Sequence, residues 1–315
     1  MKTVILDADT LGCDMDLTVF RRFGEVIVYP TVADDKIAEA IADCDIVVVN
    51  KKRICRETAG NPRRLRLIAV TATGYDNIDL AYCREKSIAV TNVRGYSTDC
   101  VAQITVTMAL SLIANLSAYT EYVNSGAYTA SGIQNHLSPP YHEIAGKTWG
   151  IFGLGNIGKR VAAVAKALGC RVIATKRTPD PDYECVSLDT LCRESDILSV
   201  HTPLTAETRG AIGRRELMLM KPSAILINVA RGAVLDEKAV CDAVLDGRIA
   251  GFGADVYAKE PFSEDSPYTL LLNRQNVILT PHMAWGGYET RVRLIDELCL
   301  NIADFLMGGR RNRVD

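Results

Sequence analysis

Three polar residues whose side chains suit anion binding and proton transfer follow apolar segments in the second half of the chain. Arg231, Glu260 and His282 each come directly after a predicted strand. In open parallel sheets, ligands bind outside the carboxyl ends of the strands, so these side chains are candidates for a common site. Taken singly, each also fits a plain role, as a surface arginine, an exposed loop glutamate or a core histidine.

A glycine-rich turn lies upstream of these residues. Gly153, Gly155 and Gly158 form a G-x-G-x-x-G pattern between an apolar segment, 148–152, and a predicted helix, 157–168. The pattern alone is weak, but a strand before it and a helix after it are the context that it needs. The first glycine permits a tight turn, the second a close approach to a pyrophosphate, and the third helix–strand packing. The helix N-terminus adds free N–H groups and a partial positive charge, so we predict dinucleotide binding.

The next predicted strand, 171–174, ends where a carboxylate normally bonds the adenosine ribose of NAD. The residues that follow are Thr175, Lys176, Arg177 and Thr178, with no carboxylate among them. A carboxylate repels a 2′-phosphate, whereas lysine and arginine bind one. We therefore predict a preference for NADP over NAD. In the alternative, Lys176 and Arg177 are surface charges and NAD binds less tightly.

Short apolar runs alternate with helical segments along most of the chain. Runs such as 46–49 and 67–70 have the length and β-branched content of buried strands, and 80–85 is typical of a helix. This alternation indicates βαβ units and parallel sheets. It stops at a proline-containing loop, 133–143, and then restarts. At roughly 150 residues per domain, we predict an α/β protein with two Rossmann-like, doubly wound parallel-sheet domains and a cleft between them.

One segment, 100–120, has no charged residue and is long enough to cross a bilayer. Gln103, Thr107, Ser111 and Asn115 recur every four residues within it and would line one helical face. That polar face argues against a membrane span. We predict one buried helix at a domain or subunit boundary.

Composition excludes several classes of function. The net charge is −2, which gives no basic excess for nucleic acid or an anionic membrane. Asp7 and Asp9 follow the first apolar residues too closely for a secretory signal, so a cytoplasmic location is expected. The ten cysteines form no CxxC pair and have no histidine at metal-ligand spacing, so we expect no metal site. Most should be reduced, buried side chains.

Taken together and in order, these motifs resemble the D-isomer-specific 2-hydroxyacid dehydrogenases. The resemblance runs from about residue 40 to residue 300. It rests on the glycine turn and on HTPLT (201–205), NVARG (228–232), DVYAKEP (255–261) and TPHMAW (280–285). Within the family, TATGYDNID (71–79) and PHMAW (281–285) are most similar to glycerate dehydrogenases, also called hydroxypyruvate reductases.

The resemblance implies reversible hydride transfer from NAD(P)H to a small 2-oxo acid, giving the D-2-hydroxy acid. Arg231 would hold the carboxylate and the 2-oxo group with its planar fork. His282 would protonate the developing alkoxide, and Glu260 would bond the other ring nitrogen, orient the ring and fix its tautomer. Backbone N–H groups around Thr73 and Gly74 would help to bind the substrate carboxylate.

The resemblance also assigns residues to the cofactor. His201 is expected to shape the cofactor loop rather than to transfer protons. The expected cofactor-binding set is Gly153, Gly155, Asn156, Ile157, Gly158, Lys176, Arg177, His201, Thr202, Pro203, Val229, Ala230, Arg231, Asp255, His282 and Trp285.

The family's architecture implies a discontinuous substrate domain, 1–97 plus 288–315, and an NAD(P)-binding domain, 98–287. The segment 126–141 and the uncharged helix resemble the family's dimer contact, so a homodimer is expected. Two alternatives stay open. The chain would be a corepressor-like scaffold if it bound the dinucleotide without significant turnover. Arg94, where the family more often has proline, either faces water or favours a substrate with a second carboxylate or phosphate.

Overall fold

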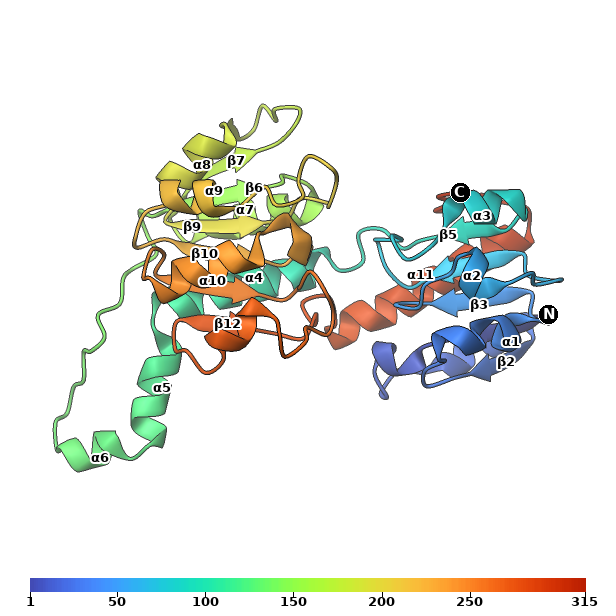
Figure 1. The fold of residues 1–315 in the computed structure, drawn as a ribbon, viewed down its shortest axis with the longest axis horizontal. Coiled ribbons are helices and arrows are strands. Elements are labelled where there is room, and N and C mark those ends of the chain that lie inside the picture. Colours follow the sequence, from blue (N-terminus) through green and yellow to red (C-terminus); the bar gives the residue numbers. More distant parts are fainter. The chain divides into compact units, whose positions relative to one another are not determined.

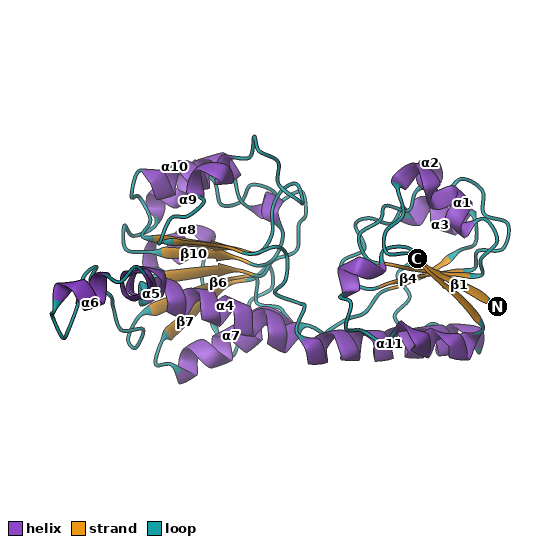
Figure 2. Cartoon of the chain, turned by 90° about the horizontal axis from the view of Figure 1, so that it is seen from below, coloured by secondary structure: helices purple, strands orange, loops and turns teal.

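The computed structural model describes residues 1–315, which form two compact units. The first unit comprises Met1–Ser97 and Gly286–Asp315, and the second comprises Thr98–Trp285. The second junction thus lies two residues before the expected one. Each unit contains one parallel sheet with helices on both faces, which confirms the predicted fold class (Figures 1 and 2).

The sheet of the first unit has the strand order β2-β1-β3-β4-β5, and all pairs are parallel. Its strands are β1 (Lys2–Ile5), β2 (Glu25–Val28), β3 (Ile46–Val49), β4 (Leu67–Val70) and β5 (Ala89–Thr91). Figure 2 shows α11 (Tyr288–Leu306) on one face and α1 (Ile37–Ile41), α2 (Arg56–Ala59) and α3 (Leu80–Glu85) on the other. Because both faces are covered, β3 and β4 are buried and wholly apolar.

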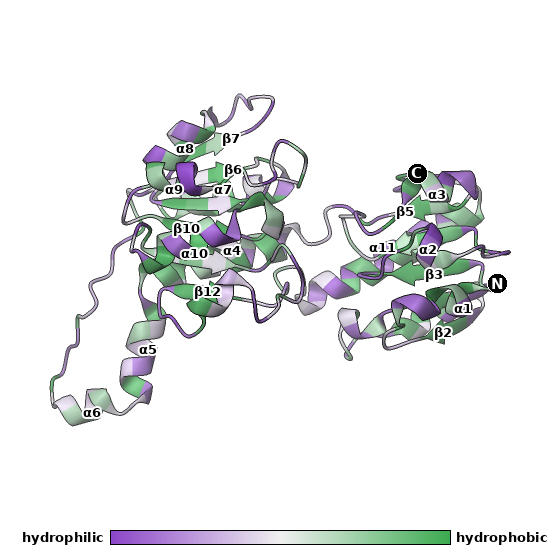
Figure 3. Ribbon diagram, in the orientation of Figure 1, coloured by the Kyte–Doolittle hydropathy of each residue, from purple (hydrophilic) through white to green (hydrophobic).

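The sheet of the second unit has the order β12-β11-β10-β9-β6-β7-β8, again parallel throughout. Its strands are β6 (Thr148–Phe152), β7 (Arg171–Thr175), β8 (Glu184–Cys185), β9 (Ile197–Val200), β10 (Ile225–Asn228), β11 (Gly251–Ala254) and β12 (Val277–Leu279). One face carries α4 (Thr98–Ile113) and α7 (Asn156–Ala167), and the other carries α8 (Leu188–Glu194), α9 (Arg214–Leu219) and α10 (Glu237–Leu245). Hydrophobic residues concentrate on the strands of both sheets (Figure 3).

Helix α4 packs directly on β11 because that strand has glycines where the helix crosses it. A Cβ atom on Gly253 would lie 3.2 Å from the Met108 sulfur, and one on Gly251 would lie 3.5 Å from a methyl group of Leu112. The small residues therefore set the distance between the helix and the sheet. This packing fixes one end of the sheet that carries the candidate site.

The prediction of one continuous helix over 100–120 is wrong. Helix α4 ends at Ile113, and a separate helix, α5 (Leu116–Asn124), begins after a bend of 66°. Asn115 stands at the break with φ +48°, a conformation that asparagine tolerates better than most residues. Its side-chain amide donates a hydrogen bond to the carbonyl of Pro140 at 2.8 Å, which ties the bend to the loop that contains Pro140.

The break redirects the chain into an extension that we call the arm, residues 116–143. It contains α5, the short helix α6 (Ala127–Ser131) and the returning loop, and it extends away from the sheet of its unit (Figure 1). No single helix of the chain has the length and apolar content to span a membrane. The bent pair α4 and α5 meets those criteria by length and composition only.

The ten cysteines are unpaired, and seven of them are buried. Burial raises the pKa of Cys44, Cys83 and Cys192 to about 12, so these thiols stay protonated and unreactive. They act as small hydrophobic side chains, in agreement with the expectation that most cysteines are reduced and buried.

A buried carboxylate joins two loops at the carboxyl edge of the first sheet. Asp7, which follows β1, accepts hydrogen bonds from the backbone N–H groups of Asn50, Lys51 and Lys52 at 3.0, 2.6 and 3.2 Å. These residues follow β3, the neighbouring strand. Asp7 therefore fixes the loop after β3 to the end of β1.

Replacing Asp7 should destabilise the first unit. Asp7→Ala leaves the three N–H donors without their charged acceptor, and we expect a loss of about 2–4 kcal/mol in the free energy of unfolding, measured by urea denaturation. Asp9→Ala removes an exposed carboxylate nearby and should change it by less than about 0.5 kcal/mol. Equal unfolding free energies for the two variants would contradict this account of Asp7.

Candidate active site

The three polar residues singled out by position extend from adjacent strands of the second unit. Strands β10, β11 and β12 are neighbours, and in register Asn228 pairs with Ala254, which pairs with Leu279. Because the strands are parallel and about 4.8 Å apart, their carboxyl ends lie side by side at one edge. Arg231, Glu260 and His282 all follow at this edge.

A buried asparagine shapes the loop that carries Arg231. The side-chain amide of Asn228 donates to the carbonyl of Arg231 at 3.0 Å, and its oxygen accepts from the N–H of Ala230 at 3.1 Å. One fully buried side chain thus braces the whole turn. This role of Asn228 was not predicted from the sequence, although an asparagine at a strand end, three residues before an arginine, was the available signal.

The Arg231 loop lies against the turn that holds Glu260. A Cβ atom on Gly232 would come within 1.9 Å of the Tyr257 carbonyl carbon, so only glycine permits this approach. The backbone N–H of Tyr257 donates to Oε1 of Glu260 at 3.0 Å. This bond fixes one oxygen of the carboxylate, so that the other oxygen can face His282.

That other oxygen contacts the histidine. Oε2 of Glu260 lies 2.6 Å from Nδ1 of His282, and the two side chains are 30% and 24% exposed. A short, partly shielded contact of this kind is a charge-assisted hydrogen bond when the ring is protonated. Since Nδ1 faces the carboxylate, Nε2 is the ring nitrogen that would exchange a proton with a substrate.

The loop around His282 is held in an uncommon conformation. His282 has φ +53°, which costs a non-glycine residue roughly 1–2 kcal/mol. The buried carboxylate of Asp255 accepts from the Thr280 hydroxyl at 2.6 Å and from the N–H groups of Met283 and Ala284, each at 2.8 Å. Asp255 thus clamps both sides of His282, a positioning role beyond the expected cofactor contact.

The glycine turn joins β6 to α7, and its three glycines differ in what requires them. Gly153 has φ +103°, and a Cβ there would lie 2.5 Å from the Thr202 nitrogen; a Cβ on Gly158 would lie 2.3 Å from the Gly153 carbonyl oxygen. Gly155 has a negative φ, and nothing lies within 4 Å of the corresponding Cβ position. Packing therefore requires the first and third glycines, while the second leaves room at the N-terminus of α7. That room fits a close approach by a pyrophosphate.

A cluster of ion pairs lies at the end of β7. Lys176 pairs with Asp180 at 3.2 Å, and Lys159 of α7 pairs with the same carboxylate oxygen at 2.7 Å. The hydrogen bond from Lys159 is the main cause that lowers the pKa of Asp180 to about 2. The strand end has no carboxylate, as predicted, but the position of Asp180, four residues after Lys176, beside both lysines was not predicted. Arg177 is exposed beside this cluster.

His201, which follows β9, is a half-buried residue with a hydrogen bond inside the second unit. Its Nε2 lies 2.9 Å from the Ser199 hydroxyl, which accepts from the indole N–H of Trp149 at 2.9 Å. Burial lowers the pKa of His201 to about 3, so the ring is neutral at physiological pH. A ring that does not titrate near neutrality fits the expected loop-shaping role.

The remaining predicted residues fall into two groups. Asn156 and Ile157 begin α7, Thr202 and Pro203 follow β9, Val229 and Ala230 precede Arg231, and Trp285 ends the second unit. Thr73 and Gly74 belong to the first unit, after β4, as does the exposed Arg94 after β5. Within the second unit, the structure brings Glu260 and His282 into direct contact and places the Arg231 loop on the neighbouring strand.

Comparisons with known proteins identify the family of the chain. Residues 106–284 match the sequence profile of the D-isomer specific 2-hydroxyacid dehydrogenase NAD binding domain. The chain is 34% identical to a hydroxypyruvate reductase of Blautia hydrogenotrophica, with all of both chains covered. It is 36% identical to a glycerate dehydrogenase of Methylorubrum extorquens, covering 100% of this chain and 99% of the relative.

Solved structures give the same result. The fold is similar to D-lactate dehydrogenase from Aquifex aeolicus complexed with NAD and lactic acid (TM-score 0.86, 28% identity, 100% and 99% of the chains covered). It is also similar to an acyclic imino acid reductase, Bsp5, in complex with NADPH and D-Arg (TM-score 0.86, 28% identity, all of both chains covered). The chain belongs to the D-isomer-specific 2-hydroxyacid dehydrogenase family.

Proposed function

We propose that this protein reduces a short 2-oxo acid, such as glyoxylate or hydroxypyruvate, to the D-2-hydroxy acid with NAD(P)H. The observation that carries the proposal is the 2.6 Å contact between Glu260 and His282 at the same sheet edge as the glycine turn. Relatives that match the whole chain are named hydroxypyruvate reductase and glycerate dehydrogenase, which supports a small substrate.

Each residue of the set has a distinct task. Bound NAD(P)H would supply the hydride. The guanidinium of Arg231 would bind the substrate carboxylate and 2-oxo group, because its planar fork matches them. His282 would give a proton from Nε2 to the forming alkoxide. Glu260 would keep the ring oriented and balance its charge. Thr73 and Gly74 are proposed to bind the carboxylate through their backbone N–H groups.

The catalytic assignment predicts unequal losses of turnover. His282→Ala should lower kcat by about 10²–10⁴-fold, since it removes the proton donor. Glu260→Gln keeps a hydrogen-bonding side chain but removes the charge, and should lower kcat by about tenfold. Steady-state oxidation of NADPH with hydroxypyruvate measures both. His142→Ala alters an exposed histidine of the arm and serves as the control. A kcat for His282→Ala equal to that of this control would remove His282 from the mechanism.

The scaffold alternative predicts a different outcome in the same assay. A corepressor-like protein would bind NADPH tightly but would oxidise none of it across a panel of 2-oxo acids. The braced Arg231 loop and the clamped His282 loop favour the enzyme, because both order side chains that a scaffold does not need. Binding without turnover in the parent protein would favour the scaffold.

We also propose that NADP is preferred over NAD. Lys176 and Arg177 after β7 and Lys159 of α7 carry three positive charges, close to the buried carboxylate of Asp180 and the exposed carboxylates of Asp182 and Glu207. Two of the cations are already paired with Asp180. Arg177 is exposed and is therefore the cation that we expect to bind a 2′-phosphate.

Removing that cation should affect one cofactor only. Arg177→Gln should raise KM for NADPH about tenfold, because a charge-assisted hydrogen bond is worth roughly 1.5–3 kcal/mol, and should leave KM for NADH unchanged. Arg214→Gln removes an exposed cation of α9 and should change neither value. The preference is refuted if the parent enzyme has the higher kcat/KM with NADH.

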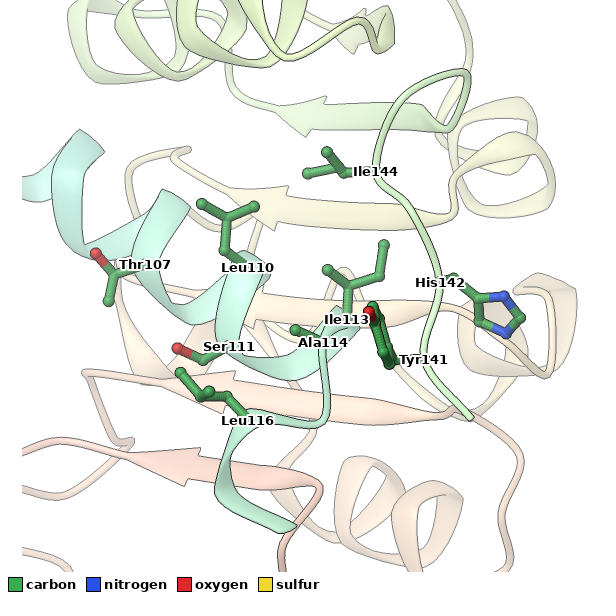
Figure 4. A pocket seen from close by; sticks show the side chains of 9 residues that line it. All are labelled: Thr107, Leu110, Ser111, Ile113, Ala114, Leu116, Tyr141, His142 and Ile144. Carbon is green, nitrogen blue, oxygen red and sulfur yellow. The ribbon is translucent and has the colours of Figure 1, made fainter. Parts of the chain in front are cut away.

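A homodimer formed through the arm is the assembly that we propose. The arm exposes large apolar side chains, among them Leu116, Leu137 and Tyr141. Beside it, α4 and the returning loop line an apolar hollow of about 420 Å³ (Figure 4). Monomeric proteins seldom expose so many neighbouring apolar groups, and a second copy of the chain would cover them.

Charged substitutions on the arm should therefore dissociate the dimer. In light scattering after size exclusion, the parent should have twice the 34.4 kDa mass of the chain, and Leu116→Asp with Leu137→Asp should have the monomer mass. Leu270→Asp replaces an equally exposed leucine outside the arm and should remain dimeric. A monomeric parent protein would refute this assembly.

A further inference from the structure

We propose that three asparagines from two distant parts of the chain, Asn92 on one side and Asn301 and Asn312 on the other, position the loop at Thr73 and thereby set the affinity for the substrate. The inference rests on the proposed role of that loop in binding the substrate carboxylate. All three residues belong to the first unit, together with the loop that they hold.

The loop after β4 is attached to the segment after β5 by three hydrogen bonds. The hydroxyl of Thr73 donates to the Val93 carbonyl at 2.8 Å, and the side-chain amide of Asn92 donates to the Thr73 carbonyl at 2.7 Å. The N–H of Val93 donates to the Ala72 carbonyl at 3.0 Å. The position of Thr73 therefore follows that of residues 92 and 93.

Residue 92 is in turn fixed by the last helix and the last residues of the chain. The amide of Asn301 in α11 donates to the Asn92 carbonyl at 2.9 Å. The N–H of Asn92 donates to the Asn312 carbonyl at 3.2 Å, and the amide of Asn312 donates to Oδ1 of Asn301 at 2.9 Å. These three hydrogen bonds link the residue after β5 to helix α11 and to the end of the chain.

Asn301 is conspicuous because the buried face of α11 is otherwise largely apolar, with Leu294, Leu298 and Ile302 on it. A fully buried amide costs free energy unless its donors and acceptor are bonded. An apolar residue would pack the helix on the sheet without that cost. The amide instead links the helix to the segment that holds Thr73, which indicates a positioning role.

Kinetics separate positioning from general stability. A loop that binds the carboxylate equally in the ground and transition states affects KM rather than kcat. Asn301→Ala should raise KM for hydroxypyruvate about tenfold, with kcat within about twofold and the Kd for NADPH unchanged. Leu298→Ala, three residues earlier on the same buried face, is the matched control. It should lower the melting temperature at least as much without raising KM.

A second variant tests the same hydrogen bonds without destabilising the fold. Asn312 has φ +52°, so Asn312→Gly relieves strain while removing the amide that bonds Asn301. We expect a KM rise of about threefold and an unchanged melting temperature. Hydrogen exchange of backbone amides in residues 71–75 should be faster in both asparagine variants than in Leu298→Ala.

The outcomes distinguish this inference from the proposed function. If the parent turns over and the asparagine variants share the KM and the exchange rates of Leu298→Ala, the positioning role is wrong. If the parent reduces no 2-oxo acid but exchange at 71–75 still increases selectively, the proposed function fails and the positioning of the loop stands.

Discussion

The hydrogen bond between Glu260 and His282 is the interaction on which the candidate site depends. It fixes Nδ1 of the ring, and it needs both partners placed to within a few tenths of an ångström. The surrounding structure supplies that placement. Tyr257 orients the carboxylate through its backbone, and Asp255 holds the loop of His282 in a conformation that the residue would otherwise avoid.

The parallel sheet explains why short loops are enough to bring the parts of the candidate site to one edge. Its carboxyl edge collects the ends of β6, β7, β9, β10, β11 and β12, so the glycine turn, the cationic loop after β7 and the loops of Arg231, Glu260 and His282 all start from one edge without long connections. Asparagine and aspartate side chains then brace the loops. Asn228 and Asp255 do so in the second unit, and Asp7, Asn92 and Asn301 do so in the first.

Much of this arrangement was predictable from local patterns. Continuous apolar runs such as Ile46–Val49 and Leu67–Val70 became central strands with the expected bounds, because burial on both faces demands that composition. Other features could not be predicted, because their sequence patterns are weaker. The edge strand Glu25–Val28 is half-exposed and polar at its start, and the bend at Asn115 depends on a bond to the distant Pro140. The ion pairs of Asp180 and the bracing role of Asn228 likewise depend on loop geometry that spacing does not encode.

In our proposal, the imidazole of His282 gives the proton during reduction of a 2-oxo acid. Chemical rescue tests this step most directly, by measuring turnover of His282→Ala with NADPH and hydroxypyruvate as free imidazole is added. The rate should rise with imidazole concentration, and the product should be D-glycerate. A rate that is unaffected by imidazole, in a variant that binds both ligands as the parent does, would contradict the proposal.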